Sequence, residues 1–391
     1  MRKQDYPLFD YNVDDVKRAS SVIAGDLSWT RETEARIKEA FQIANNWRDA
    51  HAFPMRSVRG SLRWYMHYHD VPGVTAARLK RMQAIRRKLA RPGLRPLDLH
   101  LMQDLGGCRA IVTSIADVRR LVELMRSGRH IIHHESAYIE KPKKDGYRSH
   151  HMVLEYRGRG ERKLHDGKRV EVQIRTRMQH SWATTVEAVG LLRGEDLKGN
   201  KGSSDWLRLL FLMSAEFARA EGCAEPPNAP PHKERCSEII ALDKKLQASK
   251  HLQNMSDAFR ATDDLVENPL SRPTYYLLKF DNVTKQMSVE PYFAPKEAML
   301  QYDNAEELDN HTGTTSRQNI VLVEADKLEN LKAAYPNYFG DVQLFKMQLG
   351  KVIKGKPLEE YTVRPQESVA PRPREPANLA WLKGRSKLRW K

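Results

Sequence analysis

The 391-residue sequence contains few cysteines and no long apolar run. Its three cysteines, Cys108, Cys223 and Cys236, are too few and too irregularly spaced to form a disulfide framework. No apolar run reaches the length of a membrane span, and the opening MRKQDYPLFDYNVDD lacks the apolar core of a signal peptide. We therefore expect a cytoplasmic protein with no membrane partner.

The composition is that of a basic globular protein. A hydrophobic content of 40% and the chain length are enough for a large core and about two folded units. The net charge is +16 and the isoelectric point is about 9.6. Such a charge favours an anionic partner, which could be a nucleotide, a nucleic acid or a membrane surface.

Periodicity in the sequence predicts an α+β fold. Between residues 108 and 192 the order is strand, helix, three strands and helix, which is typical of a mixed β-sheet flanked by helices. Helices are predicted at 12–50, interrupted, and at 57–69, 76–91, 115–128, 178–192, 205–221, 232–263, 295–309 and within 326–350. Strands are predicted at 108–114, 130–139, 150–158, 168–176, 274–282, 286–293 and 319–325.

The predicted helix 76–91 is strongly basic. It has seven lysines and arginines between Arg78 and Arg91 and no acidic residue. One interpretation is the solvated face of an amphipathic helix. The other is a phosphate-binding face, because a bound polyphosphate would relieve the repulsion among these cations.

A carboxylate precedes the first predicted strand of the sheet. Asp104 stands before the Gly-Gly turn in MQDLGGCRAIV, where it could hold Mg²⁺ or simply cap a turn. Arg109 could pair with Asp104 or reach a phosphate.

The segment VEVQIRT alternates polar and apolar residues. On a strand, Glu171, Gln173 and Arg175 share one face, because side chains point to alternate sides. That face could meet a hydroxyl, a base edge and a phosphate, or it could be the wet face of an edge strand.

The loop EKPKKDGYRSHH, residues 140–151, combines cations with an aromatic ring. Gly146 permits a sharp turn, Tyr147 could stack on a nucleobase, and Lys143 and Arg148 are among the residues that could contact phosphates. By itself, the loop is equally consistent with a basic solvent-exposed segment.

His232 and Cys236, with Cys223 upstream, could form half of a zinc site. Their spacing fits no common zinc pattern, and we expect ordinary residues here.

These four stretches, in this order, resemble the RelA/SpoT nucleotide pyrophosphokinase (synthetase) family, including its small single-domain and toxic branch. The matching pieces are RLKRMQAIRRKL, DLGGCRAIV, YIEKPKKDGYRSHH and VEVQIRTRMQHSWA. The resemblance covers roughly 40–200. A weaker similarity links the C-terminal elements to a small unit found in longer single-synthetase proteins.

The resemblance implies transfer of the β,γ-pyrophosphate of ATP to the ribose 3′-hydroxyl of GDP or GTP, giving (p)ppGpp-type alarmones. It implies Mg²⁺ as cofactor, with Asp104 and Glu171 as catalytic residues and metal ligands. The implied ATP-binding residues are Arg78, Lys80, Lys88 and Arg109. The implied acceptor-binding residues are Tyr147, Lys143, Arg148, His151, Gln173 and Arg175.

The loop departs from the family pattern beside the acceptor site. Ala137, Asp145, Arg148 and His150 replace the usual Asp, Asn, Gln and Leu. Two enzyme interpretations therefore stay open. The acceptor is GDP or GTP, or it is the 3′ CCA end of tRNA, as in toxic members that act in toxin–antitoxin pairs or phage defence.

A non-catalytic nucleotide or RNA binder is a third interpretation, which retention of Asp104 and Glu171 disfavours. An antitoxin or phage protein as partner and an oligomeric state are also left open. The expected organisation is a helical segment packing on the synthetase (1–75), a synthetase core (76–195), a helical linker (205–265), a small α+β unit (272–353) and a disordered basic tail (364–391).

Overall fold

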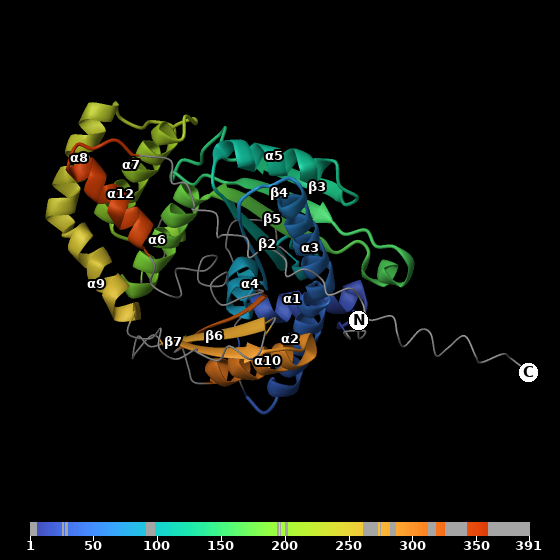
Figure 1. Cartoon of the computed structure of the whole chain (residues 1–391). Helices are drawn as coiled ribbons and strands as arrows, with labels where there is room; N and C mark the ends of the chain where they lie inside the picture. Colours follow the sequence, from blue (N-terminus) through green and yellow to red (C-terminus); the bar gives the residue numbers. More distant parts are fainter. Residues whose placement is uncertain are drawn as a thin grey trace, which may run out of the picture. The chain divides into compact units, whose positions relative to one another are not determined.

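Figure 1 shows the computed structural model of the chain. The residues that the structure describes are 6–25, 27, 30–90, 98–193, 195, 197–199, 202–260, 273, 275–281, 287–311, 318–324 and 342–358.

One mixed sheet organises the described part of the chain, in the order β3-β4-β5-β2-β1-β8-β6-β7. β2 and β5 are parallel, whereas the other neighbouring pairs are antiparallel. The expected α+β class with a mixed sheet flanked by helices is therefore confirmed. The strands are β1 (Gly73–Leu79), β2 (Gly106–Val112), β3 (Ile131–Ala137), β4 (His150–Glu155), β5 (Arg169–Thr176), β6 (Tyr275–Asp281), β7 (Met287–Tyr292) and β8 (Gln318–Glu324).

Helices lie before, between and after the strands. The α-helices are α1 (Val13–Ala24), α2 (Glu34–Asp49), α3 (Ala52–Tyr68), α4 (Met82–Leu89), α5 (Ile115–Arg126), α6 (Arg177–Arg193), α7 (Ser204–Ala220), α8 (His232–Leu246), α9 (Ala248–Arg260), α10 (Pro295–His311) and α12 (Gln343–Ile353). Short 3₁₀ helices are η1 (Leu99–Leu101), η2 (Gly160–His165) and η3 (Leu197–Gly199).

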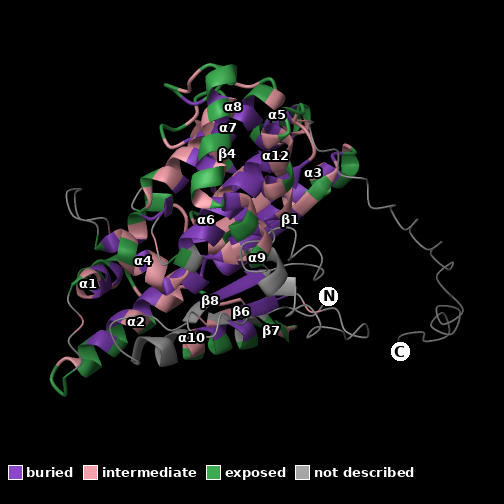
Figure 2. Ribbon diagram, turned by 90° about the vertical axis from the view of Figure 1, so that its left-hand side faces the viewer, coloured by how far each residue is buried: buried purple, intermediate pink, exposed green. Residues whose placement is uncertain are grey.

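One face of the sheet is the apolar core. Val170, Val172 and Ile174 of β5 are fully buried and belong to one cluster with residues of α3, α5 and α10. Figure 2 shows β6 and β8 largely buried as well. A second apolar cluster joins α6, α7, α8, α9 and α12, and a third joins α1, α2 and α4. Because these apolar side chains of β5 fill the core, the alternating polar side chains point to the opposite face of the sheet.

The prediction of one helix over 76–91 is wrong in its first part. Residues 73–79 form β1, which pairs with β2 along its whole length from Gly73↔Val112 to Leu79↔Gly106. The helix α4 begins only at Met82, and its buried stripe is Met82, Ile85 and Leu89. Pairing with β2 overrides the helical spacing of the first residues, so Arg78 lies on a strand and Lys80 just after it.

Two further predicted boundaries differ from the structure. The predicted helix 57–69 begins earlier, at Ala52, because Pro54 is tolerated in a first helical turn. The predicted helix 232–263 is two helices, since Gln247 adopts a left-handed conformation with φ of 48° between α8 and α9. The predicted hairpin of β6 and β7 is confirmed.

The C-terminal strands continue the same sheet. β8 pairs with β1 through Ala77↔Glu324 and Arg78↔Val323, and β6 pairs with the other side of β8. The helix α12 packs against α6, α8 and α9. The proposed domain boundaries remain predictions, but the described strands of the predicted 272–353 unit share their sheet with the predicted core.

The predicted basic tail and the segment 325–341 lie outside the described residues. Among the helices that the structure describes, none has the length and apolar character needed to cross a membrane.

Candidate active site

Strand register places the predicted polar residues on one face of the sheet. Arg78 stands opposite Gly107, which stands opposite Glu171. In the neighbouring row, Arg109 is opposite Gln173, which is opposite His151. Residues directly opposite each other point to the same face, so this face is the one that does not carry the apolar core.

The alternation expected for β5 is confirmed. Val170, Val172 and Ile174 are buried in the core, whereas Glu171 and Gln173 are partly exposed on the other face. Arg175 lies on that face too but is buried, with 3% of its surface exposed.

Two lysines from separate segments converge on Asp104. Lys80 Nζ lies 2.7 Å from Asp104 Oδ2, and Lys88 Nζ lies 3.0 Å from Asp104 Oδ1. Burial alone would raise the Asp104 pKa, but the two ammonium groups outweigh it and lower the pKa below its usual value. Burial also lowers the Lys80 pKa, against the opposing effect of Asp104. The three side chains form a compact, partly exposed cluster with one negative and two positive charges.

Glu171 is held by a chain of hydrogen bonds. Its Oε1 lies 3.0 Å from His151 Nδ1, and its Oε2 accepts a 2.9 Å bond from the Gln173 amide. The other ring nitrogen of His151 lies 2.7 Å from the Tyr147 hydroxyl. The carboxylate therefore has a fixed orientation on the polar face of the sheet.

The pKa shifts of the hydrogen-bonded residues Glu171 and His151 favour an ionised Glu171. Burial would raise the Glu171 pKa, but its bond with His151 outweighs burial and lowers it, although the nearby negative charge of Asp104 opposes the change. Burial would likewise lower the His151 pKa, but Tyr147 and Glu171 raise it. The effect of Asp104 on Glu171 means that the two carboxylates lie close enough to interact electrostatically.

Aromatic side chains of the segment 138–151 and of α6 form a cluster, and Tyr147 of this cluster is linked to Glu171 through His151. The Tyr147 ring centroid lies 6.0 Å from that of Tyr138 and 6.3 Å from that of Trp182. Lys143 Nζ lies 4.4 Å from the Tyr138 centroid and 5.2 Å from the Tyr147 centroid. The sequence prediction named Tyr147 and Lys143 but missed Tyr138, although its position nine residues earlier in the same motif was visible.

Arg148 is placed differently from the other predicted acceptor residues. Its Nη1 lies 2.7 Å from Glu221 Oε2 beyond the end of α7, and both side chains are almost fully buried. Glu221 also accepts hydrogen bonds from Thr176 and Gln179. The structure therefore uses Arg148 to attach the loop to the end of α7, and an acceptor contact by this residue stays a prediction.

Glu187 of α6 is a residue whose role the sequence did not indicate. Its Oε1 accepts a 2.7 Å bond from Lys198 Nζ. Burial would raise the Glu187 pKa, but Lys198, Arg78 and Arg109 lower it far below its usual value. Glu187 is the one acidic residue in the sequence of α6, which was an available signal. The charge of Glu187 is therefore coupled to those of Arg78 and Arg109, two of the predicted ATP-binding residues.

The chemistry of the site suits a nucleotide with its metal ion. Mg²⁺ prefers oxygen ligands and is commonly held by one or two carboxylates together with substrate phosphates. Asp104 and Glu171 supply such oxygens, and Arg78, Lys80 and Lys88 supply cations around them.

Comparison with known proteins identifies this region. Residues 77–190 match the family model described as a region found in RelA / SpoT proteins. This part of the chain is therefore a RelA/SpoT-type domain. That span contains Arg78, Lys80, Lys88, Asp104 and Glu171, and it ends within α6.

Curated relatives match between 30% and 41% of this chain. GTP pyrophosphokinase YwaC of Bacillus subtilis is 29% identical over 123 residues, which are 30% of this chain and 58% of the relative. GTP pyrophosphokinase YjbM of the same organism is 28% identical over 134 residues, 33% of this chain and 61% of the relative. The GTP pyrophosphokinase of Escherichia coli K12 is 28% identical over 166 residues, 41% of this chain and 21% of the relative. The matches thus span less than two thirds of each of these relatives.

Solved structures of similar proteins cover just under half of this chain. A GTP pyrophosphokinase family protein from Streptococcus pneumoniae is 24% identical, with a TM-score of 0.37, over 49% of this chain and 89% of that chain. Small alarmone synthetase 2 from Bacillus subtilis is 22% identical, with a TM-score of 0.37, over 44% of this chain and 90% of that chain.

Proposed function

We propose that the protein transfers the β,γ-pyrophosphate of ATP to the ribose 3′-hydroxyl of GDP or GTP. The observation that carries the proposal is that Asp104, paired with Lys80 and Lys88, precedes a strand whose neighbours carry Arg78 and Glu171 in one row on the polar face of the sheet. The names of the curated relatives, which are GTP pyrophosphokinases, support this choice of reaction.

The cationic residues would bind the triphosphate of ATP. Lys80 and Lys88 are paired with Asp104. An incoming triphosphate would compete for the two ammonium groups, and the Asp104 carboxylate would be released to hold Mg²⁺ together with Glu171. The bound ion would supply charge neutralisation on the phosphate oxygens.

Glu171 would act on the attacking hydroxyl. The 3′-oxygen forms a bond to the β-phosphorus, and the bond from that phosphorus to the oxygen bridging it to the α-phosphate breaks. AMP then leaves with the electron pair. The hydroxyl proton passes to a Glu171 oxygen, which the bonds from His151 and Gln173 aim. Because the Glu171 pKa is lowered, the carboxylate mainly orients the hydroxyl and accepts the proton as the new bond forms.

The aromatic cluster would bind the acceptor base. Tyr147 and Tyr138 offer partly exposed rings, and Lys143 lies over both. A purine stacked on such rings gains roughly 1–3 kcal/mol.

The second candidate acceptor is the 3′ end of tRNA. The net charge of +16 favours this larger polyanion. The reaction at the phosphorus and the roles of Glu171 and Asp104 would be the same for both acceptors.

The test is incubation of the full chain with ATP labelled at the γ-phosphate and with GDP, GTP or tRNA in separate reactions. Label on the guanine nucleotides supports the proposal, and label on tRNA alone replaces it with the second candidate. Absence of transfer to every acceptor would leave a nucleotide-binding role instead.

A pair of glutamate variants tests the assignment of Glu171. The substitution Glu171→Gln should lower kcat about 100-fold or more, because general acid–base groups contribute about 10²–10⁴-fold. The matched control is Glu123→Gln, an exposed glutamate on α5 at the apolar face of the sheet, which should keep full activity. Equal activities of the two variants would exclude Glu171 as the catalytic carboxylate.

A further inference from the structure

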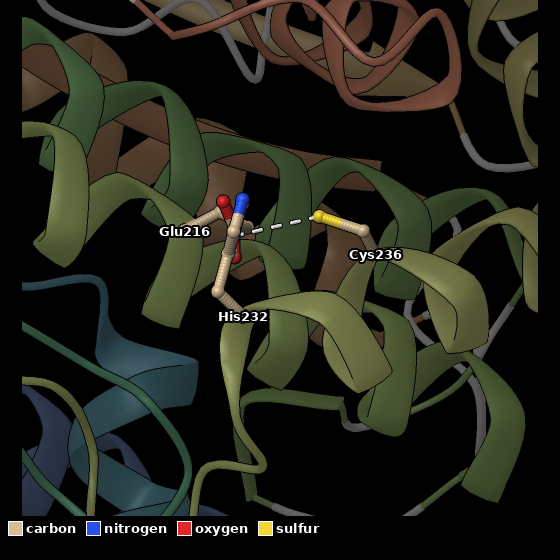
Figure 3. Close-up of side chains that lie close together, drawn as sticks. All are labelled: Glu216, His232 and Cys236. Carbon is tan, nitrogen blue, oxygen red and sulfur yellow. Dashed lines mark hydrogen bonds and ion pairs between the residues drawn. The ribbon is translucent and has the colours of Figure 1, made fainter.

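Three potential metal ligands of different types meet between α7 and α8. Glu216 extends from α7, and His232 and Cys236 extend from successive turns of α8 (Figure 3). His232 Nδ1 lies 3.0 Å from Glu216 Oε1 and 3.6 Å from Cys236 Sγ. Across the described ranges, this is the one group of three or more such side chains close enough to share an ion. It lies outside the RelA/SpoT-type domain.

The spacing of the three atoms fits a tetrahedral ion. Bonds from Zn²⁺ of about 2.3 Å to sulfur and about 2.0 Å to nitrogen separate these two ligands by about 3.5 Å. The corresponding nitrogen–oxygen separation is about 3.3 Å. The observed separations of 3.6 Å and 3.0 Å are close to these values, and all three ligand atoms lie within 4.8 Å of one another, so rotations of the side chains can bring them onto one ion.

The charges around the cluster also suit a divalent cation. Arg235 is fully buried and bonds Glu216 through Nε and Glu225 through Nη1, the latter at 2.6 Å. These three groups carry a net charge of −1. A thiolate and a divalent ion add +1, which brings the cluster to neutrality. Arg235 would then orient the Glu216 carboxylate, as hydrogen-bonding neighbours of metal ligands commonly do.

The cluster is reachable from solvent. The His232 side chain is 45% exposed and Cys236 is partly exposed. Water can therefore enter and serve as the fourth ligand. We propose that Glu216, His232 and Cys236 bind one Zn²⁺ or a chemically similar divalent transition-metal ion, which fastens α8 to α7.

The position of Glu216 on α7 links this site to the acceptor loop. Two residues earlier, Ser214 donates a hydrogen bond to the carbonyl oxygen of Gly146. Five residues later, Glu221 pairs with Arg148. An ion that fixes α7 against α8 would therefore also steady the helix on which the loop rests.

Cobalt titration of the metal-stripped full chain tests the site. One Co²⁺ per chain should bind stoichiometrically, with a thiolate-to-cobalt charge-transfer band and the intense ligand-field bands of tetrahedral cobalt. Stoichiometric Zn²⁺ should displace it and raise the melting temperature. Binding that does not saturate near one equivalent, or spectra without the thiolate band, would overturn the proposal.

Cysteine variants test whether the bound cobalt is coordinated by Cys236. Cys236→Ser should remove the thiolate band and weaken binding about tenfold or more, whereas Cys223→Ser should leave both unchanged. Cys223 is the matched control, because it lies between α7 and α8 but contacts the Glu221 carbonyl oxygen instead. His232→Gln is a second variant at an exposed position, so its fold should be retained while its affinity falls. Loss of the band in Cys223→Ser and its retention in Cys236→Ser would refute the assignment.

Discussion

The buried ion pair between Arg148 and Glu221 gives a sharp test of how the acceptor loop is held. The substitution Arg148→Met removes the guanidinium but keeps a long side chain. Glu221→Gln removes the charge but keeps one oxygen, which at the position of Oε2 can still accept from Arg148 and Gln179. In the native protein the pair is 2.7 Å apart, and the two side chains are 2% and 0% exposed.

The magnitude follows from leaving one charge buried without its partner. Breaking such a pair costs about 3–5 kcal/mol of the free energy of unfolding. Arg148→Met should be near the lower value, because Glu221 keeps its bonds from Thr176 and Gln179. Glu221→Gln should be near the upper value, because the buried guanidinium keeps a single, weaker bond. The double variant should lose less than either single variant, since no buried charge then remains without its partner.

Urea denaturation followed by tryptophan fluorescence measures these values, since Trp182 and Trp206 are buried in α6 and α7. The KM for the acceptor nucleotide is measured for the same variants. If Arg148→Met changed the free energy of unfolding by less than about 0.5 kcal/mol while raising the acceptor KM, the structural assignment of Arg148 would be refuted and a direct acceptor contact supported.

Two further predictions concern Glu187 and His51. Glu187→Gln should raise the KM for ATP about fivefold with little change in kcat, because its charge acts on Arg78 and Arg109 and such an interaction is worth about 1 kcal/mol. Lys198→Ala, which removes only its exposed partner, should leave the KM unchanged, and equal effects of the two would contradict this role. Burial, reinforced by Lys168, lowers the pKa of His51 to about 3, below its unfolded value of about 6.5. The unfolded state therefore binds the proton first, so stability is present above pH 6.5 and is lost as the pH falls. At pH 5 the loss is about 2 kcal/mol, from a shift of about 1.5 pH units. In His51→Asn, the free energy of unfolding from urea denaturation should vary less between pH 7 and pH 5. An unchanged pH dependence of this free energy would exclude His51 as the cause.

The sequence predicted the features that depend on local pattern. The alternation in VEVQIRT predicted the buried face of β5 and the polar face that carries Glu171 and Gln173. The order of strands and helices from 108 to 192 was correct as well. Both follow from side-chain periodicity within one element, which the sequence contains directly.

Features that depend on distant partners were not predictable in this way. The short segment around Arg78 has both helical and strand spacing, and only pairing with β2 and β8 decides between them. The sequence predicted Arg148 as a phosphate ligand, because its ion-pair partner Glu221 lies 73 residues later in the chain. Likewise, Glu216 joins His232 and Cys236 only because α7 and α8 pack together, whereas the sequence suggested Cys223 as their companion.

The pairing of β8 with β1 has a consequence for any shortened version of this protein. A piece ending after α6 would leave the outer side of β1, at Ala77 and Arg78, without its partner strand and exposed to water. Such a bare edge is a template for strands of other molecules, so the fragment should tend to self-associate. Its aberrant pairing would begin at the strand that carries a predicted ATP ligand.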